Sequence, residues 1–147
     1  MFGAFIIALG LVVGQAAPTP HRLDVTQLTA QDEMTVELDS AGCYHHERYE
    51  FQFRFRPSGA EVCVARWDHK KKAYKFLHER ELTKKHLIQI QNLLAHMRKP
   101  PAEGCTTTER VRFDVVRKGR PYASERYIDM TCAGSTDPTL FSWGDLI

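Results

Sequence analysis

Hydrophobic and polar residues alternate with a period of two in several segments, which is typical of β-strands with one buried face. Residues 34–38 alternate Met, Val and Leu with Thr and Glu. Residues 48–56 place four aromatic rings on one face and charged or amide side chains on the other. Each ring buries on the order of 150–250 Å², so the aromatic face is predicted to lie in the core.

Turn residues between the alternating segments predict hairpins. Pro57-Ser-Gly59 precedes a returning strand at residues 61–67, and the sequence leaves open which of its two phases faces inward. Residues 73–77 predict a short further strand of this meander. A second hairpin is predicted from the alternation at 110–115, the turn Lys118-Gly119 and a returning strand at 122–131.

One segment has helical rather than strand periodicity. Thr83 is a good N-cap, and Leu82 and Leu87 are spaced as a hydrophobic staple. The apolar residues that follow recur at helical spacing, and Pro100-Pro101 ends the helix. These residues form a single stripe: Leu87, Ile90, Leu94 and Met97.

The elements predict an α+β domain, in which an antiparallel sheet of about five or six strands in two hairpins carries one α-helix on its apolar face. The chain has 147 residues, enough for one domain, and we assign that domain to residues 33–147. No βαβ unit carries a glycine-rich loop, which excludes a dinucleotide-binding fold.

The first twenty residues contain no charged side chain and include the apolar run 5–13, followed by small residues. This pattern predicts a secretory signal peptide over residues 1–17, cleaved after Ala16 or Ala17, and then a polar lead-in over residues 18–32. The run is shorter than the roughly 20 residues of a transmembrane anchor. No Lys or Arg precedes it, so a buried N-terminal strand or helix is the alternative. We expect a secreted or periplasmic protein.

Composition narrows the classes of partner. Lys and Arg outnumber Asp and Glu by 20 to 18, and a net charge of +2 gives no support for a nucleic-acid binder. None of the G-x-S-x-G, H-E-x-x-H or P-loop motifs occurs. We therefore expect no cofactor, although a missing motif does not exclude an enzyme.

The four cysteines agree with export, because even numbers of cysteines in small exported proteins form disulfides. They are Cys43, Cys63, Cys105 and Cys132. Pairing about the second hairpin brings Cys105 close to Cys132, which is our preferred bridge. The other two are expected either to pair with each other or to remain free thiols.

Cys43, His45 and His46 form the one local cluster with ligand chemistry, since thiolate and imidazole bind zinc or copper. Adjacent histidines on a strand point to opposite faces, however, so we assign no metal site. A metal- or thiol-dependent enzyme built on this cluster is kept as the alternative function.

The polar faces of the two hairpins suggest a binding surface instead. Arginines on this phase are able to bind carboxylates or phosphates in bidentate fashion if the hairpins share a sheet. The predicted binding residues are Tyr44, His45, His46, Arg48, Arg54, Arg56, Arg110 and Arg112. The expected function is a non-enzymatic interaction module, of which an inhibitor is one form, with an acidic protein or an anionic envelope polymer as its partner. A solvated face with cross-strand ion pairs is the alternative interpretation.

Overall fold

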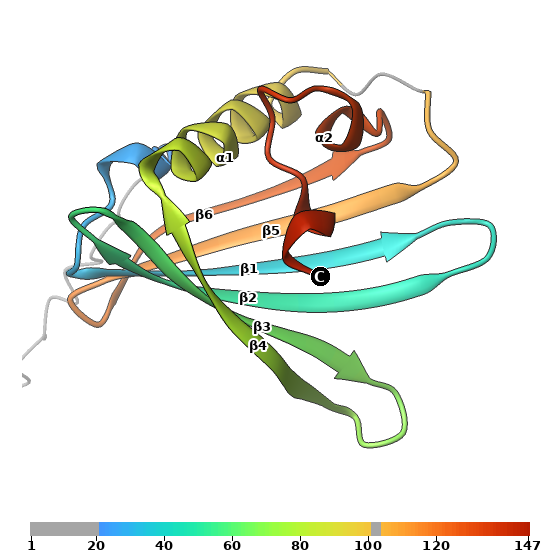
Figure 1. The fold of residues 1–147 in the computed structure, drawn as a ribbon, viewed down its shortest axis with the longest axis horizontal. Helices are drawn as coiled ribbons and strands as arrows, with labels where there is room; N and C mark the ends of the chain where they lie inside the picture. The colour runs from blue at the N-terminus through green and yellow to red at the C-terminus, as the bar shows by residue number, and fades with distance from the viewer. Residues whose placement is uncertain (1–20, 101–103) are drawn as a thin grey trace, which may run out of the picture.

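The computed structural model describes residues 21–100 and 104–147, so the predicted signal peptide at residues 1–17 lies outside the described residues. Six strands form one open antiparallel sheet in the order β4-β3-β2-β1-β5-β6 (Figure 1). The strands are β1 (Asp32–Ala41), β2 (His46–Arg56), β3 (Gly59–Asp68), β4 (Ala73–Thr83), β5 (Thr108–Arg117) and β6 (Arg120–Asp129). The helix α1 (Lys84–Met97) covers one face of the sheet. The predicted α+β class is confirmed.

We call the face that carries α1 the inner face and the opposite face the outer face. The inner face is largely apolar and buried on β1, β2, β3 and β5, whereas much of β4 is exposed and β6 also carries the charged residues Glu125 and Asp129 on this face. On β2 the predicted aromatic face points inward, with Phe51 fully buried. On β3 the inward phase is that of Val62 and Val64, which resolves the phase that the sequence leaves open. The central strand β1 pairs with β2 on one side and β5 on the other, joining the two hairpins into one sheet.

The edge strand β4 is longer than the sequence predicts and is largely exposed. The register of β3 and β4 shifts by one residue at Val64/Ala65, and Leu77 therefore has no cross-strand partner on β3. Phe76 and Leu77 are 60% and 38% exposed, because the β3–β4 hairpin extends past the end of α1 (Figure 1). Charged residues between the apolar ones obscure this strand in the sequence.

The start of α1 follows from its local sequence. Thr83 has extended backbone at the N-cap, and its backbone N–H donates to Nδ1 of His86 at 3.0 Å. Leu82 and Leu87 are both buried, as the hydrophobic staple predicts. No helix within the described segments has the length and apolar composition needed to cross a bilayer.

The C-terminal segment forms the second part of the layer that covers the inner face. It consists of α2 (Ala133–Thr136) and the 3-10 turn η2 (Trp143–Leu146), which lie beside α1 above the sheet (Figure 1). Trp143 stacks on Phe51 with ring centroids 5.0 Å apart, and Phe141 N–H donates to the Gln89 carbonyl at 3.2 Å. Helix and segment together close the core.

The chain enters the core earlier than the sequence suggests. Leu23 and Val25, the latter in the 3-10 turn η1 (Val25–Gln27), are 1% and 0% exposed. Leu23 N–H donates to Glu125 Oε1 at 2.7 Å, and Arg98 donates to the Leu23 carbonyl at 2.6 Å. The packed domain therefore begins before residue 33. Two apolar residues in a polar stretch give no periodic signal, and for that reason the pattern assigns them to a lead-in.

Candidate functional site

Arginines from three strands converge on a hollow of about 510 Å³ in the outer face. We call this feature the arginine hollow. Its guanidinium groups come from β2, β5 and β6, which are brought together because β1 pairs with both β2 and β5. The four arginines are Arg48, Arg110, Arg112 and Arg126.

The first of these arginines is held by aromatic side chains. The Arg48 guanidinium carbon lies 5.3 Å from the centre of the Trp67 ring, a cation–π contact. Trp67 in turn meets Tyr74 edge to face at 5.2 Å. Tyr74 lines the hollow, and its partial burial raises the pKa of its phenol, with Arg48 acting in the opposite direction. This side of the hollow is therefore partly apolar.

The opposite side concentrates positive charge. Arg112 on β5 lies directly opposite Arg126 on β6, and Arg110 lies two residues along β5 on the same face. Arg112 Nε is 2.6 Å from Asp114 Oδ2, but its N–H is not aligned for a hydrogen bond, so this contact is an ion pair only. Within residues 21–100 and 104–147, neither Arg110 nor Arg126 forms an ion pair.

Two carboxylates also line the hollow. Asp39 on β1 lies between its cross-strand partners Arg48 and Arg110, and it is bonded to His46 Nε2 at 2.9 Å. Glu37 lies opposite Arg112. The hollow therefore holds four guanidinium groups against two carboxylates, one of which already has an imidazole partner.

The other two predicted arginines lie elsewhere. Arg54 and Arg56 share the outward phase of Arg48 on β2, but they lie near the other end of the strand, roughly 20 Å or more away at 3.4 Å per residue. Arg54 is 3.8 Å from Glu61, and Arg56 is paired with both Glu61 and Glu81. These two residues form a solvated ion-pair cluster, as the alternative interpretation holds.

The residues of the predicted metal or thiol cluster diverge. His46 faces Asp39 on the outer side, whereas His45 Nε2 is 3.3 Å from Ser40 Oγ. Cys43 is exposed, and Tyr44 projects fully into solvent at the tip of the β1–β2 hairpin. In the part of the chain that the structure describes, no three His, Cys, Asp or Glu side chains are arranged to hold a metal ion.

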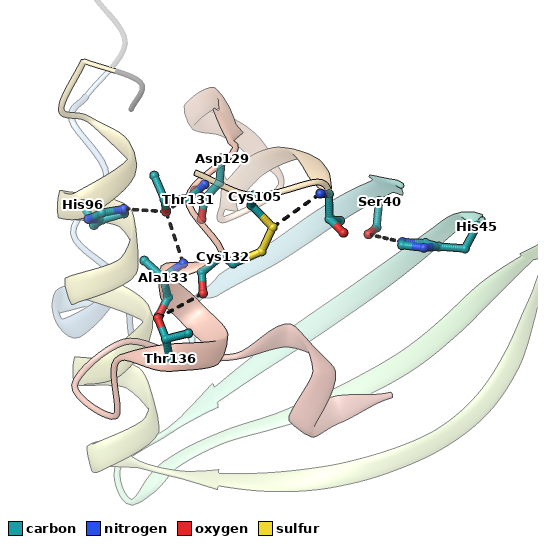
Figure 2. The surroundings of a disulfide bond; sticks show 10 residues. Ser40, His45, His96, Cys105, Asp129, Thr131, Cys132, Ala133 and Thr136 are labelled. Carbon is teal, nitrogen blue, oxygen red and sulfur yellow. Dashed lines mark hydrogen bonds between the residues drawn. A yellow bond between two sulfur atoms is a disulfide. The ribbon is translucent and has the colours of Figure 1, made fainter. Parts of the chain in front are cut away.

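The disulfide joins the base of the second hairpin to the C-terminal segment, and it is the predicted pair. Cys105 and Cys132 are bonded with Cα atoms 5.5 Å apart (Figure 2). Close by, the Thr131 hydroxyl donates to Asp129 and lies 3.1 Å from His96 of α1. Cys43 and Cys63 are free thiols, the second of the two expected outcomes.

A smaller cavity of about 250 Å³ lies beside the disulfide on the inner side of the sheet. Glu109 and Asp129, which are cross-strand partners, both line it, as do Ser40 and His45. Burial raises the pKa of Glu109, and the neighbouring Asp129 carboxylate raises it further, while His45 lowers it. This acidic pair is not among the site residues predicted from the sequence, because local spacing does not show that the two carboxylates are cross-strand partners.

Arg126 is the other residue that sequence reasoning missed. Polar and apolar residues do not alternate cleanly along this strand, because Glu125 shares the phase of Ala123 and Ile128 shares the phase of Arg126. The sequence therefore contains no signal for the face on which Arg126 lies. Comparison with protein-family models, with curated protein sequences and with solved structures finds no match. The geometry of the arginine hollow therefore carries the functional proposal.

Proposed function

We propose that this chain is an exported, non-enzymatic binding domain that captures an acidic protein segment in its arginine hollow. The observation that carries the proposal is the convergence of four guanidinium groups, of which Arg48, Arg110 and Arg126 form no ion pair among residues 21–100 and 104–147, although Asp39 lies across the sheet from the first two. Unpaired guanidinium groups on one surface favour an anionic ligand, because each offers a planar fork of donors to a carboxylate.

The rest of the lining favours a protein over a simple polyanion. Tyr74 and Ile128 border the hollow, and Ile128 is 51% exposed. Protein interfaces are enriched in arginine and aromatic residues, and their strongest contacts combine the two types. The contact of Arg48 with Trp67, which meets Tyr74 edge to face, supplies such a pair next to the charged groups.

The chemistry of the hollow supports binding rather than proton transfer. Arginine stays protonated at all physiological pH values and therefore does not serve as a general acid or base. The alternative enzyme built on Cys43, His45 and His46 has no convergent geometry to support it, because the two histidines bond different partners on different sides of the hairpin.

Two observations support export. A disulfide closes the hairpin of β5 and β6, and disulfides persist in oxidising compartments. The apolar run in residues 5–13 is typical of a leader. The proposed location is the periplasm or the outside of the cell.

The test compares binding of labelled polyglutamate and polylysine of equal length by fluorescence anisotropy. We expect polyglutamate to bind, and the double variant Arg48→Ala/Arg110→Ala to weaken binding about tenfold or more. The matched control is Arg54→Ala/Arg120→Ala, which removes the same charge away from the hollow and is expected to bind as the unaltered protein does. Equal weakening in both variants, or none in either, would refute the proposal. Binding of polyphosphate in place of polyglutamate would instead assign an anionic polymer as the partner.

A further inference from the structure

The edge of the sheet beside the arginine hollow is not paired by any strand of the described residues. β6 is the last strand in the sheet order, so one row of its backbone groups points away from β5. Among the described residues, no backbone group bonds to that row between Tyr122 and Ile128. Unpaired N–H and C=O groups on a strand edge form a template for another strand.

The two edges of the sheet differ in how they are protected. β4 carries a bulge at Leu77 and a lysine, Lys75, both of which discourage pairing with another chain. β6 also has a register shift, at Val115/Val116 near the start of the strand, but its pairing with β5 is regular from Ala123 to Asp129, and β6 has no lysine. Its one proline, Pro121, lies at the start of the strand. β6 is thus the less protected edge, and it borders the hollow.

We infer that the acidic segment binds as an added β-strand along β6, an inference that rests on the proposed function. An added strand would lie about 4.8 Å from β6, with every second side chain on the outer face. Acidic residues at alternate positions would then stand beside Arg126. No acidic side chain of β5 lies directly opposite Arg126, because Arg112 occupies that position.

A partner of different sequence fits this edge better than a second copy of the chain. On the outer face β6 presents only Ser124, Arg126 and Ile128 over its regular part. A β6 strand from a second copy would bring no carboxylate to that face, and it would add another arginine. Glu125 lies on the inner side, where Arg98 already binds it.

The experiment uses the oxidised protein and a capped peptide of about eight residues, the length of an edge strand, in which Glu alternates with Thr. Two further peptides carry N-methyl groups on all Glu or on all Thr residues. In a strand, the backbone N–H groups of alternate residues point to the same neighbouring strand. Only one of the two methylated peptides therefore loses hydrogen bonds to β6. That peptide is expected to bind about tenfold more weakly, and the other to bind nearly as the unmethylated peptide does. Hydrogen exchange of the β6 amides is expected to slow, and that of the β4 amides to stay the same.

Charge reversal identifies the residue in contact. The Arg126→Glu variant is expected to lose binding of the Glu-Thr peptide and to bind a Lys-Thr peptide instead. The Arg120→Glu variant, with the same change in charge at the far end of β6, is expected to show neither change.

The outcomes separate this inference from the proposed function. If the Glu-Thr peptide binds but both methylated peptides bind equally well, or if β4 rather than β6 is protected, strand addition is refuted and capture of acidic segments stands. If polyglutamate and the peptide both fail to bind, the proposed function fails. Self-association through β6, seen as a dimer by sedimentation, would also overturn the inference.

Discussion

Arg112 on β5 and Arg126 on β6 are direct cross-strand partners, so two guanidinium groups stand side by side on the outer face of the sheet. Like charges in this relationship destabilise a sheet. Of the two, Arg112 alone has an ion-pair partner among the residues that the structure describes, Asp114 at 2.6 Å. The repulsion lowers the stability of the free protein, and an anionic ligand would relieve it.

Replacing Arg126 by Gln is therefore expected to stabilise the protein while weakening its binding of acidic ligands. The expected gain is about 0.2–1 kcal/mol, the size of a cross-strand pair. It should be largest near 0.01 M salt and fade near 1 M, because salt screens exposed charges. Urea unfolding at several ionic strengths measures it. A loss of stability at low salt would show that the pair is not repulsive.

The Cys105–Cys132 disulfide is expected to contribute strongly to stability. It closes a loop with a sequence separation of 27, for which loop-closure entropy gives about 3–4 kcal/mol. Cys105→Ser/Cys132→Ser should lower the free energy of unfolding by about that amount, whereas Cys43→Ser, at an exposed site, should change it by less than about 0.5 kcal/mol. Titration of the denatured protein should find two free thiols, and four would contradict the bridge.

Glu109→Gln is expected to stabilise the protein at neutral pH. Burial and Asp129 raise the pKa of Glu109, so its ionisation costs more in the folded than in the unfolded chain. Its contribution to stability is present at low pH and is lost as the pH rises through the raised pKa. The gain of the Gln variant should therefore appear above the ordinary glutamate range and disappear below it. Glu33→Gln, at an exposed position, is the control, and a gain independent of pH would contradict the assignment.

The contribution of Glu125 to stability is expected to depend on pH in the opposite direction from that of Glu109. Burial tends to raise the pKa of Glu125, but hydrogen bonds from Tyr127, Leu23 and Arg98 outweigh it, so the pKa is lowered. Its contribution is present above the ordinary glutamate pKa and is lost as the pH falls through the lowered value.

The variant Glu125→Gln leaves Arg98, whose side chain is 14% exposed, without its carboxylate. We expect a loss of about 3 kcal/mol at neutral pH and a shallower fall of stability in acid than in the unaltered protein. Thermal unfolding from pH 7 to pH 3 measures both. Parallel pH profiles for the two proteins would contradict this role.

Leu23 is expected to behave as a core residue. It is 1% exposed and bonded through both backbone groups, so Leu23→Ala should cost about 2–5 kcal/mol. Arg22→Ala, one residue earlier and exposed, should have little effect. Near-equal unfolding midpoints for the two variants would show that the segment is a peripheral lead-in after all.

The elements of this fold are strongly encoded in local sequence. The alternation of four aromatic residues along β2 and the staple of Leu82 with Leu87 each depend on neighbours a few residues apart. The order of the strands in the sheet, in contrast, does not depend on such local neighbours. The pairing of β1 with β5 joins segments separated by the whole β2–α1 region, and no local pattern indicates it.

The candidate site is predictable only in part for the same reason. Arg48, Arg110 and Arg112 could be assigned to outward phases, but phase does not show position along the sheet. Arg54 shares the phase of Arg48 and yet lies at the other end of β2, beside Glu61. Arg126 enters the hollow through the register of β6, which depends on how the second hairpin pairs.

The placement of Trp143 against Phe51 has a consequence for how the protein matures. Phe141, Trp143 and Leu146 seal the inner face, so a chain that emerges amino end first keeps those rings uncovered until residue 146 has appeared. During that interval the unfinished polypeptide exposes apolar side chains of the inner face to solvent. The core is covered only when these last aromatic residues pack against the sheet.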